Sequence, residues 1–305
     1  MMPKRILITG TSTGFGRDTA ERLARRGDHV FATMRALSGR NAAHREALER
    51  LASDEGLRLR VLELDVTDQK SVDSAIAAAL EEAGDLDVVI NNAGIAAIGV
   101  TEAFTPDQFE QIFAVNVYGV VRVNRAVLPS MRRQGSGLLV HVSSGAGRVT
   151  IPAVAAYCAS KYALEAIADA YRYELLPFGV DSILVEPGVY RTGIHDRWMY
   201  PADDARIVEY GSTAEFAQRV DGVFQAIVGA PDAPGSGEVV DALVALIDMA
   251  PEQRPFRTVV SAPIRQLLDS YNASADALRP IVAQIFNVPE LARSRVHQVG
   301  STESI

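Results

Sequence analysis

The first two thirds of the chain alternate short runs rich in β-branched residues with longer stretches of helical spacing. The expected strands lie near residues 5–9, 29–34, 58–64, 86–91, 137–143 and 180–186, and a later strand near 256–260 completes the sheet. The expected helices lie near 15–26, 41–53, 69–83, 106–134, 155–177, 213–229 and 236–250. Strands that alternate with helices pair in parallel and are covered on both faces. The pattern therefore predicts an α/β fold with a doubly wound, mostly parallel sheet in three αβα layers.

Domain organisation follows from the same pattern. No linker interrupts the alternating units before about residue 187, so residues 1–262 are expected to form a single domain. The pattern loosens after that point, and residues from about 189 to 235 are expected to form a lid over a substrate site. Residues 263–305 indicate a C-terminal helical extension that ends in a polar tail.

Composition excludes several classes of protein. The 305 residues carry a net charge of −8 without a basic stripe, which argues against nucleic acid or an anionic membrane as a partner. Cys158 is the one cysteine, so neither an internal disulfide nor a cysteine-rich metal site can form. The histidines, among them His141, His195 and His297, show no ligand spacing, and no metal is expected.

Apolar runs along the chain are short. The run Ile6–Ile8 near the N-terminus is too short for a secretory or membrane-spanning segment. No later run reaches about 18 uninterrupted apolar residues. Together with the reduced state that a lone cysteine fits, this predicts a soluble, cytoplasmic protein that does not bind membranes.

A glycine-rich turn joins the first strand to the first helix. It contains Gly10, Thr13, Gly14, Phe15 and Gly16. Unpaired N–H groups and the positive end of the helix dipole favour a phosphate at such a position, and glycine lets the anion approach the backbone. The Gly-x-x-x-Gly-x-Gly spacing differs from the Gly-x-Gly-x-x-Gly dinucleotide fingerprint, and an ordinary turn is the alternative.

The end of the second strand bears on the choice of dinucleotide. NAD-binding proteins commonly place an acid there to accept hydrogen bonds from the ribose 2′-hydroxyl. This chain has Met34 and Arg35 instead, and a guanidinium can pair with a 2′-phosphate. NADP(H) is therefore expected rather than NAD(H). The alternative is that Arg35 is a solvated loop charge.

Tyr157 and Lys161 stand four residues apart in an expected helix and so share one face. A phenol has a pKa near 10, and a neighbouring ammonium favours its ionised form. The pair can thus act as a tuned acid and base. On its own it is also what a chance surface contact would look like.

A set of motifs in a fixed order supports a functional role for Tyr157 and Lys161. They are Thr9-Gly10-x-x-x-Gly14-x-Gly16, Asn91-Asn92-Ala93-Gly94, Asn116, Ser144, Tyr157-x-x-x-Lys161 and Pro187-Gly188. In this order and spacing the sequence resembles the short-chain dehydrogenase/reductase family over residues 5 to about 195. The resemblance implies a Rossmann-like fold and NAD(P)-dependent carbonyl–alcohol chemistry.

The resemblance also assigns roles. Tyr157 would protonate the carbonyl oxygen during reduction, and Ser144, thirteen residues earlier, would hydrogen-bond the same oxygen. Lys161 would hold the nicotinamide ribose and lower the pKa of Tyr157. Asn116 would anchor a water that leads from Lys161 toward solvent.

Further positions are implied for the cofactor. Asp65 and Val66 would flank the adenine, and Asn91, Ala93 and Gly94 would line the cofactor wall. Pro187, Gly188 and Val189 would also bind the cofactor, and Thr192 would bond the nicotinamide carboxamide. Without the resemblance, Asp65 and the Asn91-Asn92 pair are equally consistent with ordinary turns.

A mostly apolar set of residues is expected to face the substrate: Val149, Ile151, Val154, Tyr190, Trp198 and Met199. It favours a hydrophobic ketone or alcohol, although some of these side chains can simply pack the lid. The amino-acid sequences of three segments resemble the hydroxysteroid and retinol dehydrogenase branch of the family. These segments are Ala32-Thr33-Met34-Arg35, Pro177-Phe178-Gly179 and Val185-Glu186-Pro187-Gly188.

Apolar residues beyond a single stripe in the helices near 106–134 and 155–177 predict a homo-oligomer, with a dimer favoured over a tetramer. Cys158 is expected to be a buried packing residue. Three other functions stay open: an NAD(H)-dependent alcohol dehydrogenase, an epimerase or dehydratase built on the same site, and a non-catalytic dinucleotide sensor.

Overall fold

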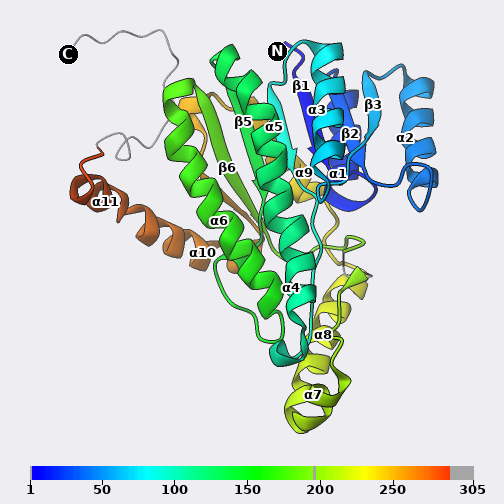
Figure 1. The fold of residues 1–305 in the computed structure, drawn as a ribbon, viewed down its shortest axis with the longest axis vertical. Helices are drawn as coiled ribbons and strands as arrows, with labels where there is room; N and C mark the ends of the chain where they lie inside the picture. The colour runs from blue at the N-terminus through cyan, green and yellow to red at the C-terminus, as the bar shows by residue number, and fades with distance from the viewer. Residues whose placement is uncertain (1, 195–196, 289–305) are drawn as a thin grey trace.

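The computed structural model describes residues 2–194 and 197–288 (Figure 1). Within them seven strands form one wholly parallel sheet in the order β3-β2-β1-β4-β5-β6-β7. The strands are β1 (Arg5–Thr9), β2 (His29–Met34), β3 (Leu59–Glu63), β4 (Val88–Asn91), β5 (Gly137–Val142), β6 (Val180–Pro187) and β7 (Arg257–Val260). The expected doubly wound α/β fold is confirmed, and all the strand pairs are parallel.

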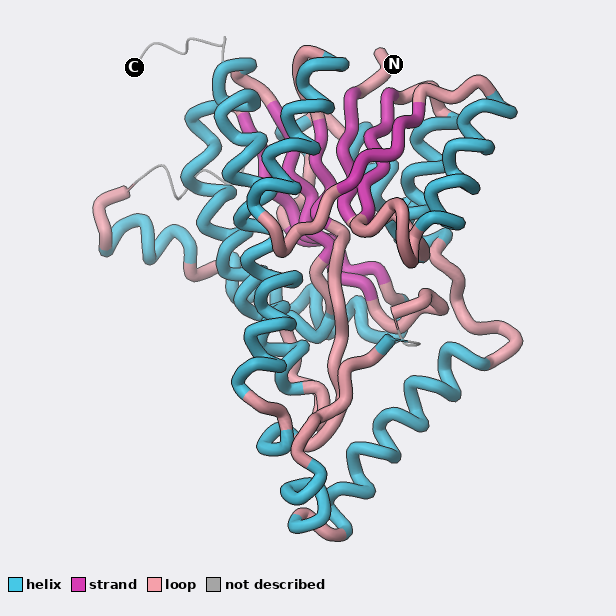
Figure 2. The backbone as a smooth tube through the Cα atoms, turned by 45° about the vertical axis from the view of Figure 1, so that its right-hand side comes forward, coloured by secondary structure: helices cyan, strands magenta, loops and turns pink. Residues whose placement is uncertain are grey.

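Helices cover both faces of the sheet, as Figure 2 shows. One face is packed by α1 (Gly14–Arg25), α2 (Ala42–Glu55) and α9 (Gly237–Asp248). The other is packed by α3 (Gln69–Ala83), α5 (Gly119–Gln134) and α6 (Ala155–Leu175). Side chains alternate along a strand, so Ile6 and Ile8 of β1 belong to the first core and Leu7 to the second.

The prediction of a single helix over 106–134 is wrong in one respect. The structure has α4 (Pro106–Phe113), then a π-helical turn at Ala114–Tyr118, and then α5. The Asn116 side chain within this turn bonds both backbone groups of Ile95, a neighbouring segment. π-Helical turns inside helices occur frequently at functional sites.

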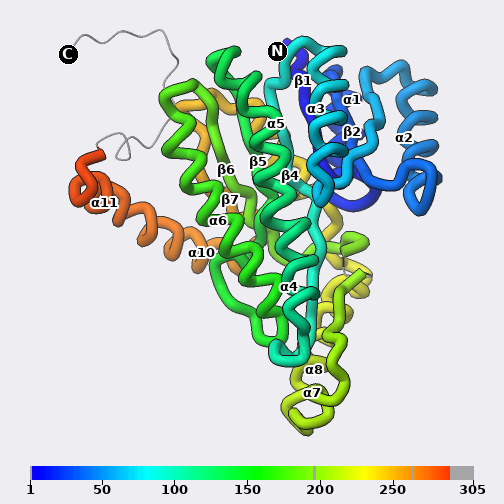
Figure 3. The backbone as a smooth tube through the Cα atoms, viewed as in Figure 1, coloured from blue at the N-terminus to red at the C-terminus, as the bar shows by residue number. Residues whose placement is uncertain are grey.

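Two helical arms extend from the sheet body (Figures 1 and 3). α7 (Asp204–Glu209) and α8 (Ser212–Gly229) occupy the narrow lower end. α10 (Ala262–Asp276) and α11 (Arg279–Ile285) follow β7 and run outward beside α6. None of the described helices is long and apolar enough to cross a membrane.

Candidate active site

A cavity of about 1480 Å³ opens at the carboxyl ends of the strands. This is the edge at which open parallel α/β sheets bind their ligands. Single small-molecule sites usually occupy about 300–1,000 Å³, so the volume has room for a dinucleotide and a substrate together. The cavity runs from the loop after β1, across the ends of β4 and β5, to α8 and α10.

The glycine-rich loop forms one end of this cavity. Gly10 and Gly14 have positive φ angles of 72° and 61°, which suit glycine. Gly10, Thr13, Gly14 and Phe15 line the cavity, whereas Gly16 lies behind them. A Cβ on Gly16 would stand 2.3 Å from Asn92 Nδ2 and 2.5 Å from the Gly10 carbonyl. The loop is therefore packed as tightly as a phosphate cradle requires, with the start of α1 directed at the cavity.

A charged rim follows at the ends of β2 and β3. Arg35 Nη1 lies 3.8 Å from Asp65 Oδ2, and both residues line the cavity. Burial would raise the pKa of Asp65, but hydrogen bonds from Thr67 and the Arg35 and Arg40 cations hold it below its usual value. Arg40 also lines the cavity and was missed from the sequence, because it carries no motif and its position depends on the loop after β2.

The cofactor wall is formed partly as expected. Val66, Ala93 and Gly94 line the cavity. Asn91 is buried and does not: its Nδ2 donates to Asn124 Oδ1 at 2.9 Å, since the last side chain of β4 points into the helix layer. The next residue, Asn92, lines the cavity instead, and its Nδ2 donates to the Thr9 and Gly10 carbonyls at 2.9 and 3.0 Å.

Ser144, Tyr157 and Lys161 meet at the centre of the cavity. Ser144 follows β5, and its Oγ accepts from the Ala146 N–H at 3.1 Å within a short 3-10 turn, η3 (Gly145–Gly147). α6 presents Tyr157 and Lys161 on one face. Lys161 Nζ lies 5.7 Å from the Tyr157 ring centre and donates to the Val142 carbonyl at 2.9 Å.

Burial governs the acid–base properties of the pair. It raises the pKa of Tyr157 to about 12, against the opposing hydrogen bond from Ser144. It also lowers the pKa of Lys161 to about 8, with Glu165 acting in the other direction. The expected lowering of the Tyr157 pKa by Lys161 is not found, because the ammonium faces the ring and is bonded to Val142. Tyr157 is therefore protonated at neutral pH.

Lys161 should accordingly lose its proton near pH 8. The chain has three lysines, Lys4, Lys70 and Lys161, so ¹³Cε NMR of labelled lysine gives three signals, and Lys161→Met assigns the one of interest. Burial favours the neutral amine, so the signal should titrate well below the ordinary lysine value of about 10.4. A midpoint above pH 10 would contradict this assignment.

Asn116 stands behind the catalytic group in the π-helical turn. Its Oδ1 accepts from Ile95 N at 2.9 Å, and its Nδ2 donates to Ile95 O and to Ser160 Oγ, each at 2.9 Å. A Cβ on Gly94 would stand 3.5 Å from Asn116 Oδ1 and 3.9 Å from Lys161 Nζ. The missing side chain of Gly94 thus leaves space between Asn116 and Lys161.

The far wall comes from the segment after β6. Pro187, Gly188, Val189 and Thr192 all line the cavity. The Thr192 Cβ is 3.2 Å from the point where a Gly14 Cβ would stand. Thr192 on this wall therefore lies next to Gly14 of the glycine-rich loop.

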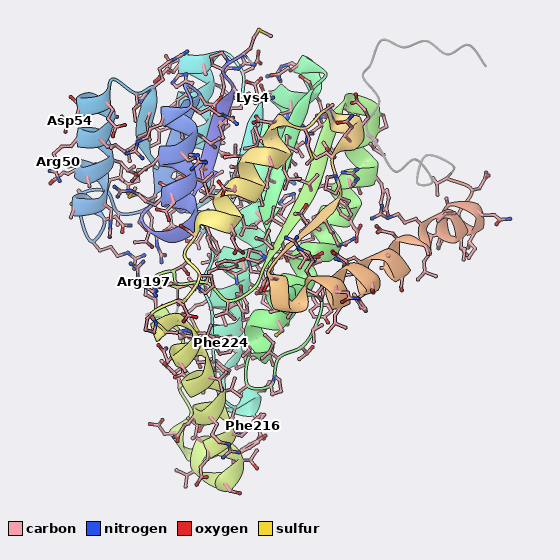
Figure 4. All side chains as sticks on the ribbon, turned by 180° about the vertical axis from the view of Figure 1, so that it is seen from behind. Lys4, Arg50, Asp54, Arg197, Phe216 and Phe224 are labelled. Carbon is pink, nitrogen blue, oxygen red and sulfur yellow. The ribbon has the colours of Figure 1, made fainter. Side chains whose placement is uncertain are left out.

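The expected substrate-facing residues Val149, Ile151, Val154, Tyr190, Trp198 and Met199 all line the cavity. Tyr190 is fixed: its hydroxyl donates to Glu238 Oε2 at 2.7 Å and to Val260 O at 3.0 Å. Large apolar lining residues from α8 and α10 were missed, namely Phe224, Ile227, Ile264, Leu267 and Leu268. They come from α8 and α10, whose helical spacing was visible in the sequence but whose docking was not. Figure 4 places Phe224 on the part of α8 nearer the sheet and Phe216 near its outer end.

Histidine and acidic side chains do not gather into a metal site within the described residues. His141 is buried beside Ser182, and burial together with Lys161 lowers its pKa to about 3, so it is neutral. His195 and His297 lie outside the described residues. Cys158 is buried, as expected for a packing residue.

A family model described as "short chain dehydrogenase" matches residues 4–201, which contain every motif described above. The chain belongs to the short-chain dehydrogenase family. The match identifies this chain as an oxidoreductase. The glycine-rich loop and the rim beside it fit the NAD(P) cofactor of such enzymes.

Curated relatives place this short-chain dehydrogenase near the expected branch. It is 37% identical to the uncharacterized oxidoreductase YusZ of Bacillus subtilis over 69% of this chain and 75% of the relative. It is 40% identical to human 17-beta-hydroxysteroid dehydrogenase type 1 over 63% of this chain and 58% of that protein. It is 35% identical to retinol dehydrogenase 8 of Bos taurus over 70% and 65%. The chain thus spans less than two thirds of the length of the last two.

Solved short-chain dehydrogenases share the whole fold. One from Streptomyces avermitilis is 29% identical with a TM-score of 0.71, over 94% of this chain and 98% of the other. One from Sphingobium yanoikuyae, in complex with NADPH, is 25% identical with a TM-score of 0.68, over 91% and 95%. One from Burkholderia phymatum, in complex with NAD, is 24% identical with a TM-score of 0.72, over 93% and 96%, and shows the fold alone.

Proposed function

We propose that this short-chain dehydrogenase interconverts a carbonyl group and a secondary alcohol on a hydrophobic substrate, with NADP(H) as cofactor. The observation that carries the proposal is that Ser144, Tyr157 and Lys161 line one cavity. Apolar side chains, among them Trp198 and Phe224, line the same cavity. A dinucleotide sensor needs the phosphate cradle but has no use for these three side chains.

The chain's own groups suit the reductive direction. The cofactor, when bound, supplies the hydride. Tyr157, protonated at neutral pH, donates its proton to the carbonyl oxygen, and Ser144 donates a hydrogen bond to the same oxygen as charge develops on it. Lys161, anchored on Val142, holds the ribose hydroxyls, and Asn116 faces the space through which a proton returns to Tyr157.

Three features of the rim support NADP(H). Met34 is buried and offers no carboxylate to a ribose 2′-hydroxyl. Arg35 and Arg40 both line the cavity, and one carboxylate, Asp65, is placed against them. Two guanidinium groups against one carboxylate leave a net positive rim, which favours a 2′-phosphate.

The double variant Arg35→Ala/Arg40→Ala tests this choice. A charge-assisted hydrogen bond contributes about 1.5–3 kcal/mol, so the KM for NADPH should rise roughly 10- to 100-fold while that for NADH changes little. Steady-state kinetics with both cofactors measure the ratio. Arg50→Ala on the exposed face of α2 is the matched control (Figure 4). Unchanged NADPH selectivity in the double variant would refute the role of the two arginines.

Substrate class is best tested with a panel of ketones, aldehydes and alcohols, assayed with NADPH, NADP⁺, NADH and NAD⁺. Apolar ketones and secondary alcohols should be turned over better than polar ones, because Trp198, Met199 and Phe224 line the cavity. One NADPH should be consumed per carbonyl reduced. Product formation without net cofactor consumption would indicate an epimerase or a dehydratase instead.

We also propose a homodimer formed through α5 and α6. Of the apolar residues that led to this expectation, Ile112, Val117 and Val120 are buried within the protomer. Several others stay partly exposed, among them Val121 of α5, the residues Ala163, Ile167 and Tyr171 of α6, and Phe113 at the end of α4. Light scattering of the purified chain measures the state directly.

A further inference from the structure

Helix α10 lies outside residues 4–201, the part of the chain that the family model matches, yet it touches the turn that carries Ser144. Ile264 Cδ1 and Leu268 Cδ1 lie 3.0 and 3.4 Å from the point where a Gly145 Cβ would stand. The Tyr271 ring packs under the Arg148 guanidinium, 4.6 Å from its centre. Helix α10 therefore contacts both ends of η3.

Asn272 makes the polar part of this contact. Its side-chain Oδ1 accepts from Arg148 Nε at 2.8 Å, and its Nδ2 donates to Glu186 Oε2 at 2.9 Å. The side chain is 6% exposed, so water competes little for either bond. An amide offers an acceptor and a donor side by side, and no other side chain of this size offers both in fixed geometry.

The two partners of Asn272 are themselves tied to the site. Arg148 directly follows η3 and is thus four residues from Ser144. Glu186 is fully buried in β6, directly before the cavity-lining Pro187 and Gly188. Asn272 therefore bridges the catalytic turn to the strand that ends at the cofactor wall, and neither motif pattern nor chain proximity places it there.

The other side of the turn packs against α6, since a Cβ on Gly147 would stand 3.1 Å from Glu165 Cγ and 3.3 Å from the Lys161 carbonyl. Ser144 Oγ accepts from Ala146 N within its own turn and hydrogen-bonds the Tyr157 hydroxyl on α6. The Tyr162 hydroxyl donates to the Arg148 carbonyl, so α6 and α10 hold Arg148 from two sides. Loss of the Asn272 side chain would remove the hydrogen bond that fixes the Arg148 guanidinium and would leave the turn held from the α6 side.

We propose that Asn272 is a positioning residue that, through Arg148, holds the turn carrying Ser144 in its reactive geometry, and that α10 is thereby part of the catalytic apparatus. The inference rests on the proposed function, because it assigns Ser144 the role of hydrogen-bond donor to the substrate oxygen. It predicts a loss in kcat that depends on the presence of Ser144.

A double-mutant cycle between Asn272→Ala and Ser144→Ala tests the proposal, with the best ketone of the panel and NADPH. Removal of one oxyanion donor costs about 100- to 1,000-fold in kcat, and a displacement of about 1 Å costs about 100-fold. Asn272→Ala should lower kcat about 10- to 100-fold in the Ser144 background, with the Kd of NADPH unchanged. In the Ser144→Ala background it should lower kcat by less than about threefold.

Ser274→Ala is the matched control on the same helix, since its exposed hydroxyl bonds only to the Ser270 carbonyl. It should leave kcat unchanged. Multiplicative losses for Asn272→Ala and Ser144→Ala would overturn the positioning role, because a purely structural residue acts independently of Ser144. A wild-type protein that reduces no ketone would overturn the proposed function and this inference together. Multiplicative losses of kcat in an active enzyme would overturn this inference alone.

Asn272→Asp gives a second, milder readout. The new carboxylate still accepts from Arg148 but faces Glu186, whose pKa burial and the neighbouring Glu165 raise to about 7. Below pH 7 a shared proton replaces the lost donor, and above it the two charges repel. Other ionisable groups around the pair are Arg148 beside η3, Arg257 on β7 and Glu165 on α6, with Asp169 and Asp276 farther along the Arg257 network.

Relative to wild type, kcat of Asn272→Asp should be nearly restored at pH 6 and fall at least about tenfold by pH 8. Circular dichroism at each pH confirms that the protein stays folded. A kcat equally low at pH 6 and pH 8 in a folded protein would contradict the bridge to Glu186.

Discussion

Tyr157→Phe is expected to lower kcat by about 1,000-fold or more while the Kd of NADPH changes less than about threefold. The substitution removes one oxygen from a ring that is packed between Ser144 and Lys161 and keeps its shape. Without the hydroxyl, the carbonyl oxygen loses its proton donor but keeps the Ser144 hydrogen bond. Stopped-flow measurement of hydride transfer and fluorescence titration of NADPH measure the two quantities separately.

Tyr118→Phe is the control for this change, since Tyr118 is exposed in the π-helical turn. It should be fully active. A Tyr157→Phe enzyme with more than about a tenth of the wild-type kcat would mean that another group protonates the substrate.

Lys161→Met should lower kcat/KM for the ketone about 1,000-fold and also weaken NADPH binding. Methionine fills a similar volume, so the buried position stays packed, but the ammonium that donates to Val142 is lost. Both effects are expected because, in the proposed function, the same ammonium holds the ribose, and it faces the Tyr157 ring 5.7 Å away. Steady-state kinetics and calorimetric titration with NADPH report the two losses.

Lys70→Met, at the exposed start of α3, is the matched control and should change neither quantity. If Lys161→Met impaired turnover but bound NADPH like the wild type, Lys161 would have an acid–base role without a binding role.

The sequence could predict the sheet and the catalytic centre because both depend on local patterns. Each strand is a short apolar run, and the alternation of strands with helices predicts a parallel sheet covered on both faces. Tyr157 and Lys161 share a face by helical spacing alone. Gly10, Gly14 and Gly16 are needed where a strand turns into a helix, which is again a local requirement.

Features that depend on the direction of a side chain at the end of an element were not predictable. Asn91 and Asn92 are adjacent and chemically identical, yet only Asn92 lines the cavity, because side chains of a strand alternate between its faces. Similarly, a helical pattern over 106–134 does not reveal the π-helical turn, whose Asn116 side chain bonds Ile95, a residue outside that pattern.

Features that depend on long-range docking were equally hidden. Arg40 belongs to the charged rim only because the loop after β2 folds back over the cavity. Asn272 lies 124 residues from Arg148 in the sequence, and no spacing rule connects them. The pKa of Tyr157 also depends on burial, which the sequence pattern does not quantify.

The arm formed by α8 differs energetically from the rest of the molecule. The structure describes every residue of α8, and none of them is buried, whereas the strands beneath the cavity are almost wholly buried. Few apolar contacts mean a low free energy for local opening, so amide hydrogens of α8 should exchange long before those of β1 or β6. Phe224 and Ile227 are thus carried by a segment that is expected to open readily, while Tyr157 and Lys161 are carried by α6, which has many buried residues. Substitutions in α8 can therefore change which substrates the enzyme admits without loss of the stability of the sheet that carries its chemistry.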